Sequence, residues 1–362
     1  MAPPGNPVIV PSLTDDADAT APAANVTGRG RSGLPRFGLR MLFVVAILFC
    51  LLAAWIGRNA ARVRQEQAAL EALLQVDAKV ELATDGDSQL NPSAPSFLSD
   101  LPEASWGDYV ARSVGWAERP RISSVELSGD YSSDAKMLAA LDALSVFPEI
   151  ESVNLIGSAF DDETIARLEH VDGLERLSLS GTEVTSAGLA RLSQTAHLRD
   201  VYVHYVSTDV LAALPRFVEL RSVHISMTDV SANDMQGIAS LPMLEELRLT
   251  HVRRTGDESL FAPLKNALNL KSLHLRDIDF SLSHLDLATI SEIRSLETLY
   301  LGRITEEQLA SFDLPPSLKK IGLGTPVTDD GARAFSALHP ELLVSHSYAW
   351  GGPLYQAGEY AP

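Results

Sequence analysis

The sequence predicts an α/β solenoid, a stack of strand–turn–helix units, preceded by one transmembrane helix. Three observations support this: a short apolar phrase recurs along most of the chain, helix-start signals follow many copies of it, and a long apolar run precedes the first copy. The phrase is an apolar residue, two variable residues, an apolar residue, one variable residue and a third apolar residue. It occurs nine times between Ile122 and Leu323.

The copies are regular in spacing and composition. Their first members are 28, 24, 24, 22, 24, 26, 26 and 22 residues apart, a spacing typical of solenoid repeats. All 27 positions are apolar in a chain that is 46% hydrophobic. The triplets are Ile122/Val125/Leu127, Ile150/Val153/Leu155, Leu174/Leu177/Leu179, Leu198/Val201/Val203, Leu220/Val223/Ile225, Leu244/Leu247/Leu249, Leu270/Leu273/Leu275, Leu296/Leu299/Leu301 and Leu318/Ile321/Leu323.

Each unit reads as a strand followed by a helix. The fourth and sixth positions alternate with a variable residue, which is the period of a half-buried strand. Helix-start chemistry follows: Ser231 and Thr305 each stand three residues before an acidic or amide side chain, and Asp161 and Thr328 can cap helices. Because strands stack about 4.8 Å apart and helices need about 10 Å, we expect the array to curve with its strands on the concave side.

These residues carry a resemblance to a known family. Leu174 to Leu189 reads LERLSLSGTEVTSAGL, and Leu318 to Gly331 repeats the turn. The pattern resembles leucine-rich repeats of the helix-backed, ribonuclease-inhibitor-like and cysteine-containing-like subclass. With the apolar run before it, the chain looks like a bacterial single-pass, membrane-anchored leucine-rich-repeat protein. One departure is the family's asparagine-ladder position, where we expect the turns to satisfy their backbone groups differently; it holds Asp130, Ser158, Thr182, Val206, Thr228, Val252, Ile278, Ile304 and Pro326.

Charge and cysteine content narrow the function. The net charge is −18; residues 1–40 carry four Arg against three Asp, so the remainder carries 25 basic against 44 acidic residues. An acidic repeat domain repels phosphate backbones, so we expect no nucleic-acid partner. The single cysteine, Cys50, rules out an intramolecular disulfide.

The apolar run predicts a membrane anchor. Met41 to Ile56 is sixteen apolar residues in succession, and Arg40 is the only charge in 37–57. That segment makes about 30 Å of helix, enough to span a bilayer core. A cleaved signal peptide is the rival interpretation, against which stand the long preceding region and the charged helix that follows. The arginine balance favours an N-terminus in the cytoplasm and repeats outside. Together with the resemblance, this implies a bacterial inner-membrane protein.

We expect the following organisation. Residues 1–36 form a disordered tail, 37–57 the span, 58–83 a juxtamembrane helix that serves as a stalk or a weak dimer contact, 84–96 a linker, 97–121 an N-terminal cap, 122–346 the repeats, and 347–362 a C-terminal tail that seals the far end or lies loose on the surface.

The candidate recognition surface follows from the strand period. The fifth position of each phrase lies between two buried residues and points to the concave face. Five consecutive units supply Tyr202, His224, Arg248, His274 and Tyr300 there. Two residues further along their strands lie His204 and Arg276. Tyr and Arg are enriched at binding hot spots, and a cationic or aromatic patch in an acidic domain favours an acidic peptide or a carboxylate ligand. A solvated polar sheet face is the alternative interpretation.

Other chemistry finds little support in the sequence. His204 and His224 lie within reach of one ion, but no third ligand is evident, so we expect no metal and no cofactor. There is no phosphate-binding glycine loop, GxSxG, HExxH or CxxC motif, so we expect no enzyme activity. The prediction is a membrane-anchored scaffold that binds a protein or peptide. A structural envelope protein that self-associates or contacts the wall is the alternative, and an enzyme with an unrecognised site comes third; the oligomeric state is open.

Overall fold

The computed structural model describes residues 39–82, 96–97, 121–129, 135–194, 197–256, 259–346, 354–356 and 359–361. The chain divides into two compact units, Met1–Ala54 and Trp55–Pro362, which are described separately. The predicted tail (1–36), most of the predicted linker (84–96) and nearly all of the predicted cap (97–121) lie outside these residues. The division of the chain into these segments therefore stays a prediction.

The first unit contains the start of helix α1 (Leu39–Leu74), which carries the apolar run. Its large apolar side chains from Met41 to Leu52 are 50% to 69% exposed on every side of the helix. Among the described residues, α1 alone is long and apolar enough to cross a membrane.

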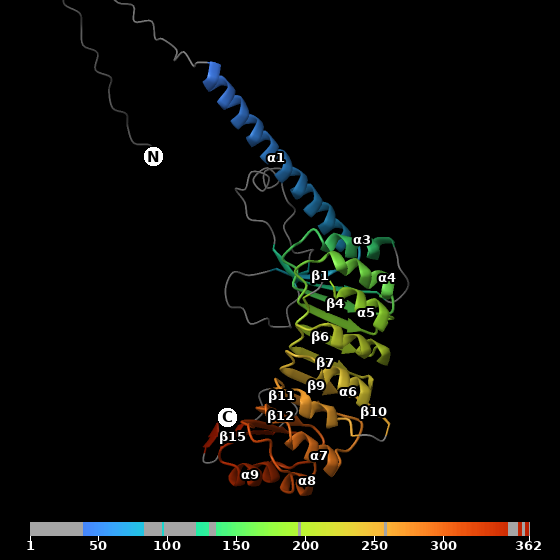
Figure 1. Cartoon of the computed structure of the whole chain (residues 1–362), viewed down its shortest axis with the longest axis vertical. Helices are drawn as coiled ribbons and strands as arrows, with labels where there is room; N and C mark the ends of the chain where they lie inside the picture. The colour runs from blue at the N-terminus through green and yellow to red at the C-terminus, as the bar shows by residue number, and fades with distance from the viewer. Residues whose placement is uncertain are drawn as a thin grey trace, which may run out of the picture. The chain divides into compact units, whose positions relative to one another are not determined.

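The second unit is a solenoid built on one continuous sheet (Figure 1). Parallel pairings join successive repeats, and helices line the opposite side of the stack (Figure 1). Ten strands form the parallel part: β3 (Ile122–Ser128), β4 (Ser152–Ile156), β5 (Arg176–Ser180), β6 (Asp200–His204), β7 (Ser222–Ser226), β9 (Glu246–Thr250), β11 (Ser272–Arg276), β12 (Thr298–Leu301), β13 (Lys320–Leu323) and β14 (Leu343–His346). The predicted fold class is confirmed.

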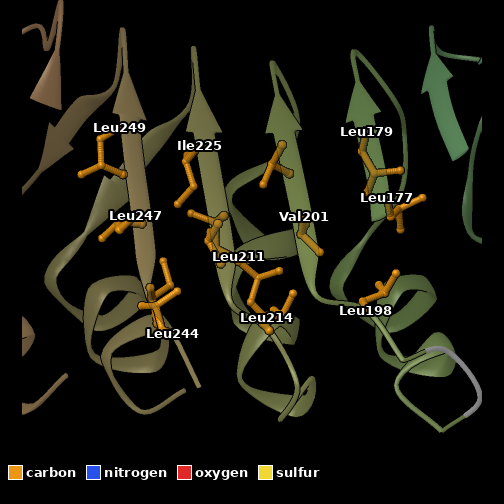
Figure 2. Packing of buried hydrophobic residues seen from close by; sticks show 14 of the residues in the cluster. Leu177, Leu179, Leu198, Val201, Leu211, Leu214, Ile225, Leu244, Leu247 and Leu249 are labelled. Carbon is orange, nitrogen blue, oxygen red and sulfur yellow. The ribbon is translucent and has the colours of Figure 1, made fainter. Parts of the chain in front are cut away.

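The core is the set of apolar phrases. All 27 predicted positions are buried, none more than 8% exposed, and all belong to one contiguous cluster. Figure 2 labels ten members of this cluster: Val201, Ile225 and Leu247 come from the neighbouring strands β6, β7 and β9, and Leu211 and Leu214 come from the helical side. Burying one such side chain contributes about 1.5–3 kcal/mol, so the repeated phrase supplies the main stabilising term of the fold.

Helices and short 3₁₀ turns connect the strands. The capping oxygens expected at Asp161, Ser231, Thr305 and Thr328 all accept backbone N–H groups at helix starts. Three repeats use 3₁₀ helices where we expected α-helices. The connecting elements are α3 (Ala135–Leu144), α4 (Asp162–Ile165), η2 (Ala166–His170), α5 (Ser186–Leu192), η3 (Thr208–Arg216), α6 (Ala232–Ala239), η4 (Ala262–Asn266), α7 (His284–Ser291), α8 (Glu306–Ala310) and α9 (Asp329–Leu338), with a small parallel pair, β8 (Asp229–Ser231) and β10 (Arg253–Thr255), beside the turns.

The asparagine-ladder position is filled differently, as expected. Val252, Ile278 and Ile304 are fully buried there, so these repeats extend the apolar core into the turn. Backbone hydrogen bonds replace the ladder. The N–H of the first residue after a strand donates to the carbonyl of the last residue of the next strand, as from Gly181 to His204 at 2.9 Å.

The N-terminal end of the solenoid is closed by the end of α1. Leu73 (0% exposed) and Ala69 belong to the core cluster, and strand β1 (Lys79–Leu82) pairs antiparallel with β3. A two-residue strand, β2 (Ser96–Phe97), extends the sheet beyond β1. The segment expected to be a stalk therefore packs on the first repeat, because an uncovered first unit would expose its core to water.

The C-terminal end carries a tenth parallel strand that the apolar phrase does not reveal. In β14 the sixth position is His346, which pairs in register with Leu323. Beyond it, β15 (Leu354–Gln356) and β16 (Glu359–Ala361) continue the sheet antiparallel. The remainder of 347–362 lies outside the described residues.

Candidate functional site: the strand face

The predicted surface residues share one face of the sheet, which we call the strand face. Tyr202, His224, Arg248, His274 and Tyr300 are in direct register on β6, β7, β9, β11 and β12. His204 pairs in register with Ser226, and Arg276 with Thr250. The structure thus brings all seven predicted residues onto five adjacent strands.

Rings gather at two places on this face. The ring of Tyr202 meets that of His224 edge-on with centroids 4.4 Å apart, and stacks on His204 at 6.0 Å. On the far side of Arg248, His274 stacks on Tyr300 with centroids 6.3 Å apart. Two aromatic clusters therefore flank one guanidinium.

Glycine makes room for one of these rings. A Cβ at Gly322, the next fifth-position residue after Tyr300, would clash with Cδ2 of Tyr300. The tyrosine ring therefore leans over the following strand, and any larger residue at 322 would displace it.

Glu246 is a functional candidate that the fifth-position pattern missed. It lies two residues before Arg248 on β9, and its Oε1 is 2.8 Å from a guanidinium nitrogen of Arg248 and 3.6 Å from Nε2 of His274. The hydroxyl of Ser222 also donates to Glu246 at 3.3 Å. The signal was present, because the third position of each phrase points to the same face as the fifth.

The electrostatics of the face differ from the expected cationic patch. Burial, reinforced by the charge of Arg248, lowers the pKa of His224 from 6.5 to about 4. Burial also lowers the pKa of His274. Both imidazoles are therefore neutral at pH 7, and Arg248 is paired with Glu246.

Arg276 and Asp200 are two further ionisable side chains of the strand face. Arg276 is paired with Asp277 at 3.3 Å, and Asp200, in line with Ser222 on the neighbouring strand, has its pKa raised by burial. The strand face is close to neutral. Because Arg248 and Arg276 are each paired with a carboxylate, no excess positive charge remains on the face to favour an acidic ligand.

The described residues give no support for a metal site, and the hollow found among them lies away from the strand face. Within the described ranges no three His, Cys, Asp or Glu residues are grouped so that they could hold a metal ion. A polar hollow lies near the starts of α7 and α8, where His284, Arg303 and Glu307 contribute to its lining. None of the seven predicted residues lines it.

The sequence matches no protein-family model and none of the curated proteins. Similar solved structures include an internalin from Listeria monocytogenes (15% identity, 67% of this chain and 70% of that chain, TM-score 0.43) and internalin C2 from the same organism (13%, 56% and 80%, TM-score 0.37). A third is TLR13 in a complex with ssRNA13 (16%, 63% and 33%, TM-score 0.42).

Proposed function

We propose that the protein is a membrane-anchored scaffold whose strand face binds a protein or peptide partner. The observation that carries the proposal is the run of Tyr, His, Arg, His and Tyr in register across five adjacent strands. Cross-strand ring pairs add only about 0.2–1 kcal/mol each to a sheet, whereas Tyr and Arg are enriched among the residues that dominate the binding energy of protein interfaces.

The anchoring part of the proposal rests on α1. Its apolar side chains are exposed around the whole helix from Met41 to Leu52. An all-round apolar helix of this length is stable only in lipid or inside a protein core, and no described part of the chain covers it. Residues 37–57 then cross a bacterial inner membrane, with the N-terminus in the cytoplasm and the repeats outside.

The partner class follows from the surface. The acidic repeat domain opposes phosphate backbones, which argues against nucleic acid. No described cluster resembles a catalytic group set, so binding accounts for the face better than turnover does. The near-neutral charge of the face favours a partner held by aromatic and hydrogen-bonding contacts.

The test is partner capture by the full-length chain in detergent, with crosslinking mass spectrometry to identify neighbours in the native host. The variant Tyr202→Ala/Arg248→Ala/Tyr300→Ala should lose capture at least tenfold while its circular-dichroism melt stays unchanged. The control variant Arg191→Ala/Leu285→Ala/Arg333→Ala changes exposed residues of the connecting helices and should capture normally. Unaltered capture by the first variant would disprove the proposal. Self-association alone, visible in light scattering, would support the structural-envelope alternative.

A further inference from the structure

The turn that leaves each strand adopts a left-handed backbone in six consecutive repeats. Glycine holds this position in the first two, Gly157 and Gly181, with φ of 111° and 64°. The next four repeats carry residues with side chains at φ between 47° and 51°: Tyr205, Met227, His251 and Asp277. In the first five of the six, the N–H of this residue donates to the next strand, so the sheet ladder uses the turn.

Side chains are disfavoured at this φ. Asp and His tolerate the left-handed region better than most residues, but a tyrosine or a methionine there is an outlier. A Cβ built at Gly181 would meet nothing within 4 Å, so the glycine there is explained by the backbone and not by lack of space. The same turn would therefore accept glycine in the later repeats, with less strain.

Of these four residues, His251 and Asp277 contact each other at 3.9 Å, whereas Tyr205 and Met227 make little use of their side chains within the protein. Tyr205 is 71% exposed and Met227 is 48% exposed. Packing against the core therefore does not explain why large side chains are kept there. Strain that the fold itself does not need points to a contact with something outside the chain.

These residues adjoin the strand face. Tyr205 directly follows His204 on β6, Met227 follows Ser226 on β7, and His251 follows Thr250 on β9. Since these three strands are neighbours in register, the three residues form a row along the strand ends, which we call the strand-end row. It runs beside the ring cluster of Tyr202 and His224.

Charges around the strand-end row are already paired within the protein. Arg253 contacts Asp229 at 2.6 Å, and Arg276 contacts Asp277 at 3.3 Å. On the strand face beside it, Arg248 contacts Glu246 at 2.8 Å. A charged partner would have to break these pairs, whereas an uncharged one would not. Three strands about 4.8 Å apart span roughly 10 Å, which matches about three residues of extended chain.

We propose that the strand-end row takes up uncharged aromatic or aliphatic side chains of an extended polypeptide segment that crosses the strand ends. Tyr205 and Met227 supply the apolar contact. His251 adds a polar edge. This inference rests on the proposed function, since it names the kind of partner that the strand face and its border would hold together.

The test uses the full-length chain in detergent and three fluorescent synthetic peptide pools of equal length: neutral and rich in aromatic and aliphatic residues, acidic, or basic. The wild type should bind the neutral pool most tightly by fluorescence anisotropy. The double variant Tyr205→Gly/Met227→Gly should bind it at least tenfold more weakly and melt about 3 °C or more above the wild type, because the backbone strain is relieved. Tyr205→Phe/Met227→Leu should keep binding within about threefold, since it retains the apolar contact.

Asp77→Gly is the matched control. Asp77 has φ of 50° at the end of α1, outside the row, so this change should raise the melting temperature and leave binding unchanged. The proposal is overturned if the double glycine variant melts lower than the wild type, if it binds the neutral pool normally, or if the acidic pool, the basic pool or no pool binds best.

The two proposals fail separately. Loss of binding in the double glycine variant with normal binding in Tyr202→Ala/Arg248→Ala/Tyr300→Ala would keep the strand-end row and reject the strand face. The reverse pattern would reject the row alone.

Discussion

Asp286 shows how one residue can hold two parts of the solenoid together. Its side chain is fully buried, closes the capping box of α7 with Ser283, and lies 3.3 Å from a guanidinium nitrogen of Arg254 on β10. Arg254 in turn lies over the ring of Phe280, 4.9 Å from its centroid. The pair ties the β8–β10 excursion to the next helix.

Asp286→Ala should lower the free energy of unfolding by about 3 kcal/mol, because a cation of which only 23% is exposed loses its partner. Asp234→Ala is the matched control. It removes the same capping-box position from α6. Within the described part of the chain no arginine pairs with Asp234, so the change should cost about 1 kcal/mol. Urea unfolding of the two variants measures the difference. Equal losses would mean that the ion pair adds nothing beyond capping.

His224 predicts a pH dependence. Its pKa is about 4 in the folded chain and near 6.5 when unfolded, so the unfolded state takes up the proton first as the pH falls. The contribution of this residue is complete above pH 6.5, declines between pH 6.5 and 4, and is lost below 4. The melting temperature of His224→Gln should therefore fall less than that of the wild type between pH 7 and 4.5. Identical pH profiles would show that burial does not keep this ring neutral.

At the scale of residues, the sequence predicted correctly those features that the alternation along a strand determines. Alternation along a strand placed Tyr202 to Tyr300 on one face, and the structure has them in register. It did not reveal that Glu246 neutralises Arg248, because the conformation of two long side chains depends on local packing and not on a repeat. It also did not reveal the left-handed φ of Tyr205, since nothing in that side chain indicates a turn.

At the scale of elements, α1 is the least expected result. The apolar run predicted a span, the residues after it a helix that continues out of the membrane as a stalk or a weak dimer contact, and residues 97–121 a cap. In the structure the helix is continuous to Leu74, and its last turns with β1 cover the first repeat. Sequence could not show this, because Ala69, Leu73, Ala78 and Val80 are too few and too irregularly spaced to distinguish a docked helix from a free one.

Leu73→Ala should destabilise the first repeat by about 2–5 kcal/mol, since this side chain is fully buried in the shared core. Leu74→Ala is the control, because Leu74 is 45% exposed one residue away and should change stability by less than about 0.5 kcal/mol. Hydrogen exchange resolves the effect: amides of β3 and β4 should exchange faster in Leu73→Ala alone. Unchanged protection there would contradict the capping role.

Because Leu73 and β1 cover the first repeat, a soluble fragment needs both of them. A fragment of residues 97–362 lacks both Leu73 and β1, so its first repeat is uncovered and it should aggregate. A fragment of residues 58–362 keeps them and should be monodisperse in light scattering. The opposite result would assign the capping role to residues after 97.

For the whole molecule, the fold could be predicted because one phrase determines both the strand faces and the core. The nine copies of the phrase predicted the order in which the strands stack. They did not predict the tenth parallel strand, in which His346 occupies a position that is apolar in the other repeats. The membrane side depends on flanking charges and not on packing. Alkaline phosphatase fused at residue 90 should be active in a bacterial host if the repeats lie outside, and inactive if they lie in the cytoplasm.

The most direct test of the central claim is site-specific photocrosslinking in the native host. A photoreactive residue would replace Tyr202 or Tyr300 on the strand face, and in a parallel experiment Leu285 or Arg333 on the connecting helices. The account predicts a discrete adduct with a different protein from the strand-face positions and none from the helix positions. Adducts from the helix positions only, or only between copies of this chain, would contradict it.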